Sequence, residues 1–381
     1  MKRIGILLAL CMVLLCVTPV KAANLEVAAK SALLMDMTTG AVLYEQNAHE
    51  KLAPASVTKV MTMLLIMEAI DSGKIAWDDT VTVSEAAAAK GGSQIYLKVG
   101  ETMSVSDMLK SVAVSSANDC ACALAEHVAG SEKAFVEKMN IRAAQLGMND
   151  THFVNCSGLD DDPDAKNHLT CAYDIALMSR ELMLGHPEIQ KFTTIWMDTV
   201  RDGAFGLSNT NKLIRFYPGA TGLKTGFTSA AGYCLSATAQ RDGLSLIAVV
   251  MGAKTSQERF AGCKSMLDYG FANYALIEPE APTSNTIPVK LGTQTVVEAV
   301  PGEDVKLLID KGQKDQINVQ VTLEEHLTAP ISKGQKVGAL TVRVGEQVLS
   351  QVPMVARETV PRLTWWDIFL QLLQRIAMSK V

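Results

Sequence analysis

The chain has 381 residues, of which 48% are hydrophobic and 20% charged. This length predicts two domains rather than one, and the apolar content excludes an intrinsically disordered chain. Because 35 basic residues stand against 40 acidic ones, the net charge of −5 offers no basic field, and we expect no nucleic-acid partner.

Residues 1–22 have the pattern of a secretory signal peptide. The basic pair Lys2 and Arg3 precedes an apolar run over 4–17, and Val20 and Ala22 flank a suitable cleavage site. A membrane-spanning helix needs about 20 apolar residues, so this run is short for a permanent anchor. We expect cleavage after residue 22 or 23, with an uncleaved anchor as the alternative. In both cases the rest of the chain is exported.

Residues 23–278 have the pattern of one α+β domain. From periodicity and breaker residues we expect a β-hairpin at 31–37 and 41–45, a buried helix at 56–70, helices within 105–128, 131–146 and 170–184, strands at 222–228, 232–240 and 244–252, and a closing helix at 256–275. Strands at both ends with helices between them predict an antiparallel sheet flanked by helices, with a helical insert.

A second, smaller domain is predicted after a linker. Pro279, Pro282 and Pro288 interrupt a polar stretch that is typical of a linker. Beyond it, apolar and polar side chains alternate at 305–310, 317–323 and 338–344. We therefore expect a small all-β domain over residues 284–356, without a catalytic constellation.

Residues 361–381 are predicted to form an amphipathic helix. Apolar side chains recur at helical spacing at Trp366, Phe369, Leu370, Leu373 and Ala377. A terminal, Trp-rich helix with interrupting charges is typical of an element that lies in a membrane interface. We expect it to anchor the chain at the outer face of the cytoplasmic membrane. The alternative is a helix docked on the protein's own core or on a partner.

The first of three chemically useful motifs is Ser56-Val-Thr-Lys59, at the start of the predicted buried helix. An offset of three residues places the hydroxyl and the amine on one helix face. A lysine in a partly apolar site can lose its proton and activate the serine. The motif is weak by itself, because chance supplies roughly one Ser-x-x-Lys in a chain of this length.

The other two motifs are Ser116-Ala-Asn118 and Lys224-Thr-Gly226. The former lies between two helical stretches, where a helix cap or turn is the simpler interpretation. The latter lies on a predicted strand, where Lys and Thr can bind a carboxylate and Gly leaves room for a peptide. An ordinary strand with a solvated lysine is the alternative there.

Together, in this order, the three motifs resemble those of the low-molecular-mass penicillin-binding proteins that are serine-type D-alanyl-D-alanine carboxypeptidases. Further stretches look like the same family: Leu52–Lys59, Gly158–Asp160 with His168, Tyr173–Asp174 and Gly222–Thr228. The layout of signal peptide, catalytic domain, small β domain and amphipathic end is also similar. The resemblance covers essentially the full chain and implies the fold shared by penicillin-binding proteins and serine β-lactamases.

What the resemblance implies is acyl transfer from the end of a peptidoglycan stem pentapeptide. Ser56 would attack the carbonyl between the two terminal D-alanines, with Lys59 as its base, and Ser116 would relay a proton to the leaving amine. The backbone N–H groups of Ser56 and Phe227 would form the oxyanion hole. Neither a metal nor an organic cofactor is implied.

Substrate binding is implied for a second set of residues: Asn118 on the amide, and Lys224, Thr225, Gly226 and Arg259 around the terminal carboxylate. A surface salt bridge is the alternative for Arg259. Penicillins mimic the terminal dipeptide and would inhibit covalently at Ser56. His168 is expected to be structural rather than catalytic.

Three other functions share some of these features. A D,D-endopeptidase performs the same chemistry on cross-links. A class A β-lactamase is less favoured, because no Glu-x-x-Leu-Asn element for deacylation occurs and the additional domain has no use. A non-enzymatic wall-binding protein would not need the intact motifs. Six cysteines lie beyond the signal peptide, and we expect buried free thiols, with oxidation as the alternative, at Cys120, Cys122, Cys156, Cys171, Cys234 and Cys263.

Overall fold

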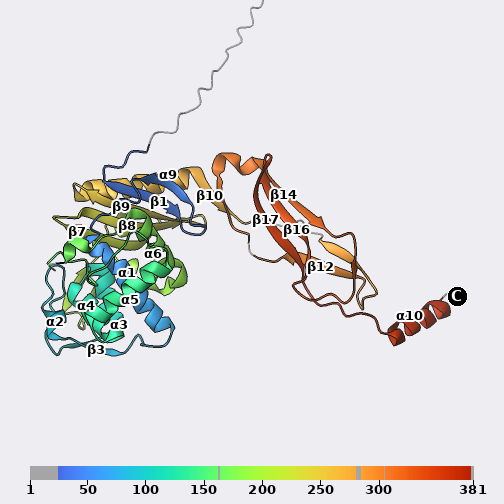
Figure 1. Cartoon of the computed structure of the whole chain (residues 1–381), viewed down its shortest axis with the longest axis horizontal. Helices are drawn as coiled ribbons and strands as arrows, with labels where there is room; N and C mark the ends of the chain where they lie inside the picture. Colours follow the sequence, from blue (N-terminus) through green and yellow to red (C-terminus); the bar gives the residue numbers. More distant parts are fainter. Residues whose placement is uncertain (1–24, 162–163, 280–284, 304, 379–381) are drawn as a thin grey trace, which may run out of the picture.

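The computed structural model describes residues 25–161, 164–279, 285–303 and 305–378. The predicted signal peptide lies outside the described residues. Along the described chain a sheet-and-helix body is followed by a smaller β-sheet body, and the helix α10 lies at the far end (Figure 1).

The first body is built on a five-stranded antiparallel sheet in the order β2-β1-β9-β8-β7. Its first two strands come from the start of the described chain and the other three from residues after 219, so the sheet joins both ends of this body. The strands are β1 (Ser31–Asp36), β2 (Val42–Gln46), β7 (Ala220–Thr228), β8 (Gly232–Arg241) and β9 (Leu244–Ala253). The predicted α+β fold is confirmed.

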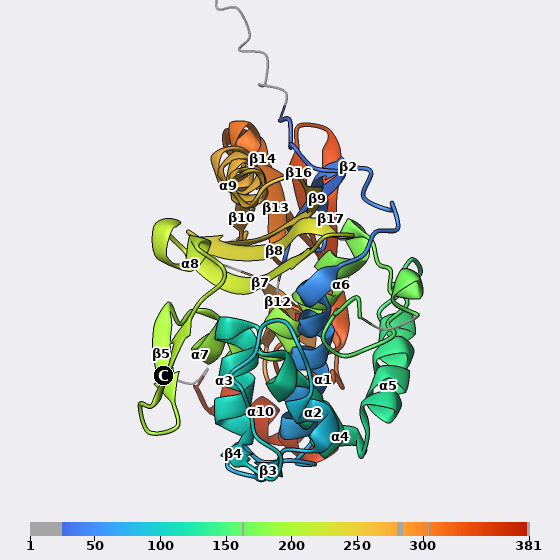
Figure 2. The ribbon, with the colours of Figure 1, turned by 90° about the vertical axis from the view of Figure 1, so that its left-hand side faces the viewer.

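Helices cover both faces of this sheet (Figure 2). The helix α9 packs on β8 and β9, and α6 packs on β9 and β1 from the other side. The helix α1 lies beyond α6, and its residues from Lys59 to Met67 are all buried, as an all-apolar helix requires. The helices of this body are α1 (Lys59–Asp71), α2 (Glu85–Ala88), α3 (Val105–Ser115), α4 (Asn118–Ala129), α5 (Glu132–Gln145), α6 (Ala172–Gly185), α7 (Gln190–Thr193), α8 (Leu213–Phe216) and α9 (Ser256–Asn273).

Two predicted helices differ in detail from the structure. The helix expected at 56–70 begins with a 3₁₀ turn, η1 (Ala55–Thr58), and its α-helical part starts only at Lys59. The stretch expected within 105–128 is two helices, because Ser116 adopts a left-handed conformation with φ of 64° and ends α3. Hydrophobic periodicity does not distinguish a 3₁₀ turn from an α-helical one, nor a one-residue kink from continuous helix.

Short elements were not predicted, because three or four residues carry too little alternation to detect. They form two ribbons and two single turns: β3 (Thr80–Thr82) with β4 (Thr102–Ser104), β5 (Met197–Val200) with β6 (Phe205–Ser208), η2 (Ala165–Asn167) and η3 (Pro187–Ile189).

The second body is a six-stranded sheet in the order β14-β16-β17-β12-β11-β15. Pro288, expected in the linker, lies within β11 instead. The predicted strand at 305–310 forms, but it pairs with β10 at the end of α9 rather than with the six-stranded sheet. The elements are β10 (Tyr274–Ile277), β11 (Thr286–Lys290), β12 (Val296–Pro301), β13 (Leu307–Asp310), η4 (Lys311–Gln316), β14 (Ile317–Leu323), β15 (Leu327–Thr328), β16 (Lys336–Val344) and β17 (Gln347–Ala356).

The last helix, α10 (Trp365–Met378), projects from the second body (Figure 1). Thr364 and Asp367 cap its start, each accepting a hydrogen bond from the other's backbone N–H. Trp365 is 67% exposed and Trp366 65%, and the apolar residues of the next two turns are also exposed. Docking on the protein's own core is therefore wrong for the first turns of this helix. No helix among the described residues has the length and apolarity needed to cross a membrane.

Candidate active site

The structure brings Ser56 and Lys59 into direct contact. In the 3₁₀ turn η1, side chains three residues apart lie nearly above one another. Lys59 Nζ donates a hydrogen bond to Ser56 Oγ at 2.9 Å and a second to the carbonyl oxygen of Ser157 at 2.7 Å. The predicted helical offset thus gives the expected pairing through a tighter turn.

The amine of Lys59 is fully buried and lacks a carboxylate partner within ion-pair distance among the described residues. Burial lowers its pKa from 10.5 to about 7, and the negative charge of Asp119, at the start of α4, opposes part of this effect. A lysine with such a pKa is neutral in a large fraction of molecules near neutral pH. It can therefore accept a proton from Ser56.

Two glycines allow the backbone to close around Ser56. A Cβ on Gly226 of β7 would lie 2.6 Å from the carbonyl oxygen of Pro54 and 3.1 Å from the backbone nitrogen of Ser56. A Cβ on Gly158 would lie 1.9 Å from the carbonyl oxygen of Ala55. Any side chain at either position would push a neighbouring segment away from the serine. The free edge of β7 therefore lies against η1.

Ser116 and Asn118 sit at the junction between α3 and α4. The left-handed Ser116 is the C-cap of α3, so the interpretation as a cap is correct as a description of its backbone. Asn118 begins α4, and its Nδ2 donates to the carbonyl oxygen of Gly91 at 2.7 Å. Its Oδ1 is buried without a hydrogen-bond partner. A buried acceptor without a partner is costly, and a ligand N–H would satisfy it.

Lys224 and Thr225 are buried on β7, so the alternative of a solvated lysine is wrong. The pKa of Lys224 is lowered well below 10.5 by burial and by the positive charges of Lys59 and Arg259. Thr225 Oγ1 donates to Thr210 Oγ1 at 2.7 Å, and the backbone N–H of Thr210 donates to the carbonyl oxygen of Val114. This chain of bonds connects the β7 motif to the end of α3, two residues before Ser116.

Arg259 of α9 is buried, and the predicted alternative of a surface salt bridge is wrong. One of its terminal nitrogens donates to the carbonyl oxygens of Gly226 at 3.0 Å and Cys234 at 3.2 Å. The C=O of Gly226 and the N–H of Phe227 belong to one planar peptide and point in opposite directions. With the carbonyl directed at Arg259, the N–H of Phe227 points to the opposite side.

Ser157 and Asn155 were not among the predicted site residues, although Gly158–Asp160 of the same loop resembles the family. Asn155 Oδ1 accepts hydrogen bonds from the N–H groups of Gly158 at 2.7 Å and Ser157 at 3.2 Å, which fixes the loop against Lys59. The available signal was an Asn placed three residues before a Gly, a common turn pattern. His168 holds the neighbouring turn, because its Nε2 lies 2.8 Å from Thr58 Oγ1, which supports a structural role.

The chain matches two families along most of its length. The family described as D-alanyl-D-alanine carboxypeptidase matches residues 18–255, and the one described as penicillin-binding protein 5, C-terminal domain, matches residues 272–362. A curated relative, D-alanyl-D-alanine carboxypeptidase DacF of Bacillus subtilis, is 44% identical over 88% of this chain and 86% of its own length.

This chain belongs to the D-alanyl-D-alanine carboxypeptidase family. Its fold agrees with solved structures of penicillin-binding proteins. Penicillin-binding protein 5 from Haemophilus influenzae is similar with a TM-score of 0.74 and 31% identity, over 88% of this chain and 98% of the other. Penicillin-binding protein D2 from Listeria monocytogenes, in its ampicillin-bound form, is similar with a TM-score of 0.60 and 36% identity, over 65% of this chain and 99% of the other.

The lowered pKa of Lys59 predicts how stability changes when its charge is removed. Its folded-state pKa of about 7 lies below the ordinary value of 10.5, so the unfolded state binds more protons between these values. The cost of burying the ammonium is complete below the folded-state pKa and falls as the pH rises towards 10.5. We expect Lys59→Met to raise the free energy of unfolding by about 1–4 kcal/mol near pH 6 and by much less near pH 9.5.

Urea denaturation at the two pH values measures this difference. Lys138→Met, which removes an exposed lysine from α5, is the matched control and should change stability little at either pH. A variant Lys59→Met that is less stable than the parent near pH 6 would contradict the prediction.

Proposed function

We propose that this chain is a serine-type D-Ala-D-Ala carboxypeptidase that removes the terminal D-alanine of peptidoglycan stem pentapeptides through an acyl-enzyme on Ser56. The observation that carries the proposal is the contact of Ser56 Oγ with the buried Lys59 amine, at 2.9 Å and with a pKa of about 7. Nucleophile and base are then paired within hydrogen-bond reach, in a chain of this family.

The reaction begins with loss of a proton from Ser56 to neutral Lys59. Ser56 Oγ then forms a bond to the carbonyl carbon between the two D-alanines, and the C–N bond of that amide breaks. Ser116 relays the proton to the leaving amine nitrogen, so that free D-alanine departs. Water, with Lys59 again as base, hydrolyses the ester and restores the serine. The Ser157 carbonyl keeps the amine beside the nucleophile throughout.

Developing negative charge is stabilised by two backbone N–H groups, those of Ser56 and Phe227. The approach of Gly226 to the nitrogen of Ser56 supports this role for one side of the oxyanion hole. The hydrogen bond from Arg259 to the Gly226 carbonyl supports the role of Phe227 on the other side of the oxyanion hole. This bond directs the carbonyl towards α9, so the N–H of Phe227 in the same peptide points away from α9. Each such donor is typically worth a few kcal/mol in the transition state.

Substrate recognition uses Asn118 together with the motif on β7. The free Oδ1 of Asn118 accepts the substrate amide N–H. The terminal carboxylate binds at Lys224, Thr225 and the backbone of Gly226. Its charge restores the protonated state of Lys224, whose pKa is lowered by burial among other cations. Arg259 contributes its charge to the same carboxylate from behind β7, since its terminal nitrogens already bind within the protein.

Penicillins are proposed as covalent inhibitors at Ser56, in keeping with the ampicillin-bound relative from Listeria. Action on cross-links, as a D,D-endopeptidase, is the same acyl transfer on another amide and is less favoured. The relative DacF of Bacillus subtilis, which matches 88% of this chain, is named a carboxypeptidase. Rapid turnover of penicillin is less favoured still, because the deacylating Glu of class A enzymes has no counterpart in the sequence.

We also propose the division of the chain and its location. Residues 1–22 would be removed on export, 23–278 would form the catalytic domain, and 284–356 a β domain that holds it above the membrane. The exposed Trp365 and Trp366 support binding of residues 361–381 to the outer face of the cytoplasmic membrane, in the cell envelope.

The proposed activity predicts two results that a single preparation of the protein should give. The purified chain should become labelled by fluorescent penicillin and should release D-alanine from a pentapeptide that ends in D-Ala-D-Ala. Ser56→Ala should do neither, while its thermal unfolding stays close to that of the parent. A parent chain that neither labels nor releases D-alanine would refute the carboxypeptidase, and rapid hydrolysis of penicillin would favour a β-lactamase.

The base role of Lys59 predicts a pH profile. Only the neutral amine can accept the proton, so the second-order rate constant of penicillin acylation should rise with pH through about 7 and then level off. Lys59→Arg keeps the charge but cannot lose its proton, and should lower this constant by at least about a hundredfold. An unchanged profile in Lys59→Arg would exclude Lys59 as the base.

The close approach at Gly226 predicts a selective loss of activity. In Gly226→Ala the new methyl group would meet Pro54, so β7 has to move away from Ser56 and the oxyanion hole widens. We expect acylation to slow by about 10–100-fold. Gly206→Ala, in the strand β6 with no atom within 4 Å of the new Cβ, is the matched control. Equal effects of both variants on acylation would argue against the close approach.

The membrane proposal predicts a change in partitioning. The parent chain should sediment with vesicles that contain anionic lipid, and a chain without residues 362–381 should stay in the supernatant with full penicillin labelling. Trp365→Ala with Trp366→Ala should weaken binding without removing the helix. Retention of the truncated chain on the vesicles would exclude α10 as the anchor.

A further inference from the structure

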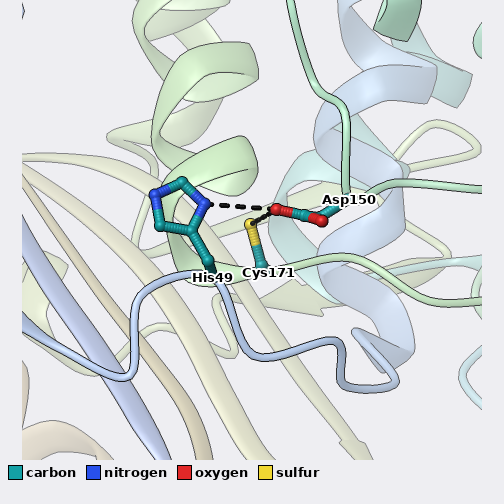
Figure 3. A group of neighbouring side chains, drawn as sticks. All are labelled: His49, Asp150 and Cys171. Carbon is teal, nitrogen blue, oxygen red and sulfur yellow. Dashed lines mark hydrogen bonds and ion pairs between the residues drawn. The ribbon is translucent and has the colours of Figure 1, made fainter.

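Three side chains with metal-binding atoms converge at a place that the proposed reaction does not use (Figure 3). His49 lies in the loop after β2, Asp150 in the loop after α5, and Cys171 is the N-cap residue of α6. Asp150 Oδ2 is 3.2 Å from His49 Nδ1 and 3.9 Å from Cys171 Sγ, and the three donor atoms lie within 4.8 Å of one another. Within the described part of the chain this is the single group of this kind.

The arrangement does not suit a cysteine nucleophile. The carboxylate lies between the thiol and the imidazole, whereas a nucleophilic cysteine needs the imidazole as its direct neighbour. Burial raises the pKa of Cys171 to about 12, with the nearby carboxylates of Asp174 and Asp150 adding to the effect.

The spacing suits a tetrahedral cation. Zinc binds nitrogen and oxygen at about 2.0–2.2 Å and sulfur at about 2.3 Å, which separates neighbouring donor atoms by roughly 3.4–3.7 Å. The distances of 3.2 and 3.9 Å lie on either side of this range, so small rotations of the exposed His49 and the partly exposed Asp150 side chains suffice, while Cys171 stays buried. We propose that His49 Nδ1, Asp150 Oδ2 and Cys171 Sγ bind a borderline-soft divalent cation, with Zn²⁺ as the preferred ion. A solvent molecule takes the fourth position.

Hydrogen bonds and ring contacts around the three donors already hold them in place. The backbone N–H of Asp174 donates to Cys171 Sγ at 3.4 Å, a bond that stabilises a thiolate. The ring of Tyr173 contacts the His49 ring at 4.9 Å between centroids. The backbone N–H of Tyr173 donates to the carbonyl oxygen of Ala48 at 3.0 Å, which fixes the His49 loop against α6.

The charges at the site also favour a cation. Lys51 Nζ lies 3.4 Å from the other oxygen of Asp150, Oδ1, and among the described residues it is the one lysine that forms an ion pair with the group. Asp174 is nearby and accepts the backbone N–H of Asp150 at 2.9 Å. A divalent ion would displace the proton of Cys171 to solvent, form the metal–sulfur bond and compete with Lys51 for the carboxylate. The side chain of Lys51 is 54% exposed and can turn away.

A bound ion would join segments far apart in the sequence next to the active-site turn. The His49 loop continues through Leu52, which exchanges backbone hydrogen bonds of 2.8 and 3.0 Å with Thr170, and then enters η1 with Ser56. The ion would therefore add a second link between the His49 loop and the segment around Thr170, which the backbone hydrogen bonds of Leu52 already join. Its expected effect is on stability rather than on the acyl-transfer chemistry.

The test is metal binding by the full chain, freed of metal with a chelator. Titration calorimetry with Zn²⁺ should give one ion per chain with micromolar or tighter affinity, and Co²⁺ should give the charge-transfer absorption of a cobalt–thiolate bond. At zinc a hundredfold above Kd, the melting temperature should rise by about 3–5 °C.

Two variants remove ligands with little harm to the fold. Cys171→Ser keeps a good N-cap residue but removes the thiolate, and should abolish the cobalt–thiolate band and weaken zinc binding at least tenfold. His49→Gln, at an exposed position, should weaken zinc binding to a similar degree. Lys51→Ala should tighten it several-fold, an effect that misfolding cannot imitate. Penicillin labelling of every variant reports that the chain is folded.

The matched controls are His127→Gln, an exposed imidazole near Asp79 with no cysteine, and Cys263→Ala, a buried thiol elsewhere. Both should bind zinc as the parent does. The proposal is overturned if the parent binds no zinc at about 100 μM, or if Cys171→Ser and His49→Gln bind it as tightly as the controls do.

Discussion

Two buried lysine amines that lack a carboxylate partner among the described residues are the constraint on which the site depends. Lys59 and Lys224 are both fully buried, and the positive charge of Lys59 adds to the burial that lowers the pKa of Lys224. Burying a charge without a partner is expensive, and the apolar surroundings of α1 supply the stability that offsets it. The same burial gives Lys59 a pKa of about 7, close to neutrality.

The site also depends on close packing of backbone segments around Ser56. Three segments that are distant in sequence meet at η1: the turn itself, the loop at Gly158 and the strand β7 at Gly226. The loop and the strand each approach the turn through backbone atoms, and the side chains of Asn155 and Arg259 hold the two segments in place. Such preorganisation is the main source of electrostatic stabilisation in acyl-transfer sites.

The sequence indicated the parts of the site that local spacing determines. Ser56 and Lys59 are three residues apart, so any helical turn pairs them, and the β7 motif lies on a strand that the sequence also predicted. The left-handed Ser116 could not be predicted, because non-glycine residues rarely adopt that conformation. Burial of Arg259 and the pairing of β13 with β10 depend on contacts between distant segments, which periodicity does not report.

The six thiols of the described chain are buried and unpaired, and this has a consequence for timing. Burial raises the pKa of the thiols at Cys120, Cys171, Cys234 and Cys263, and a hydrogen bond with Cys122 together with burial raises that of Cys156, so the native fold keeps them in the slow-reacting protonated form. An unfolded chain has no such protection, and outside the cytoplasm oxidants can pair exposed thiols wrongly. For an exported chain of this sequence, folding and oxidation therefore compete, and the outcome depends on whether the six thiols are buried before oxidants reach them.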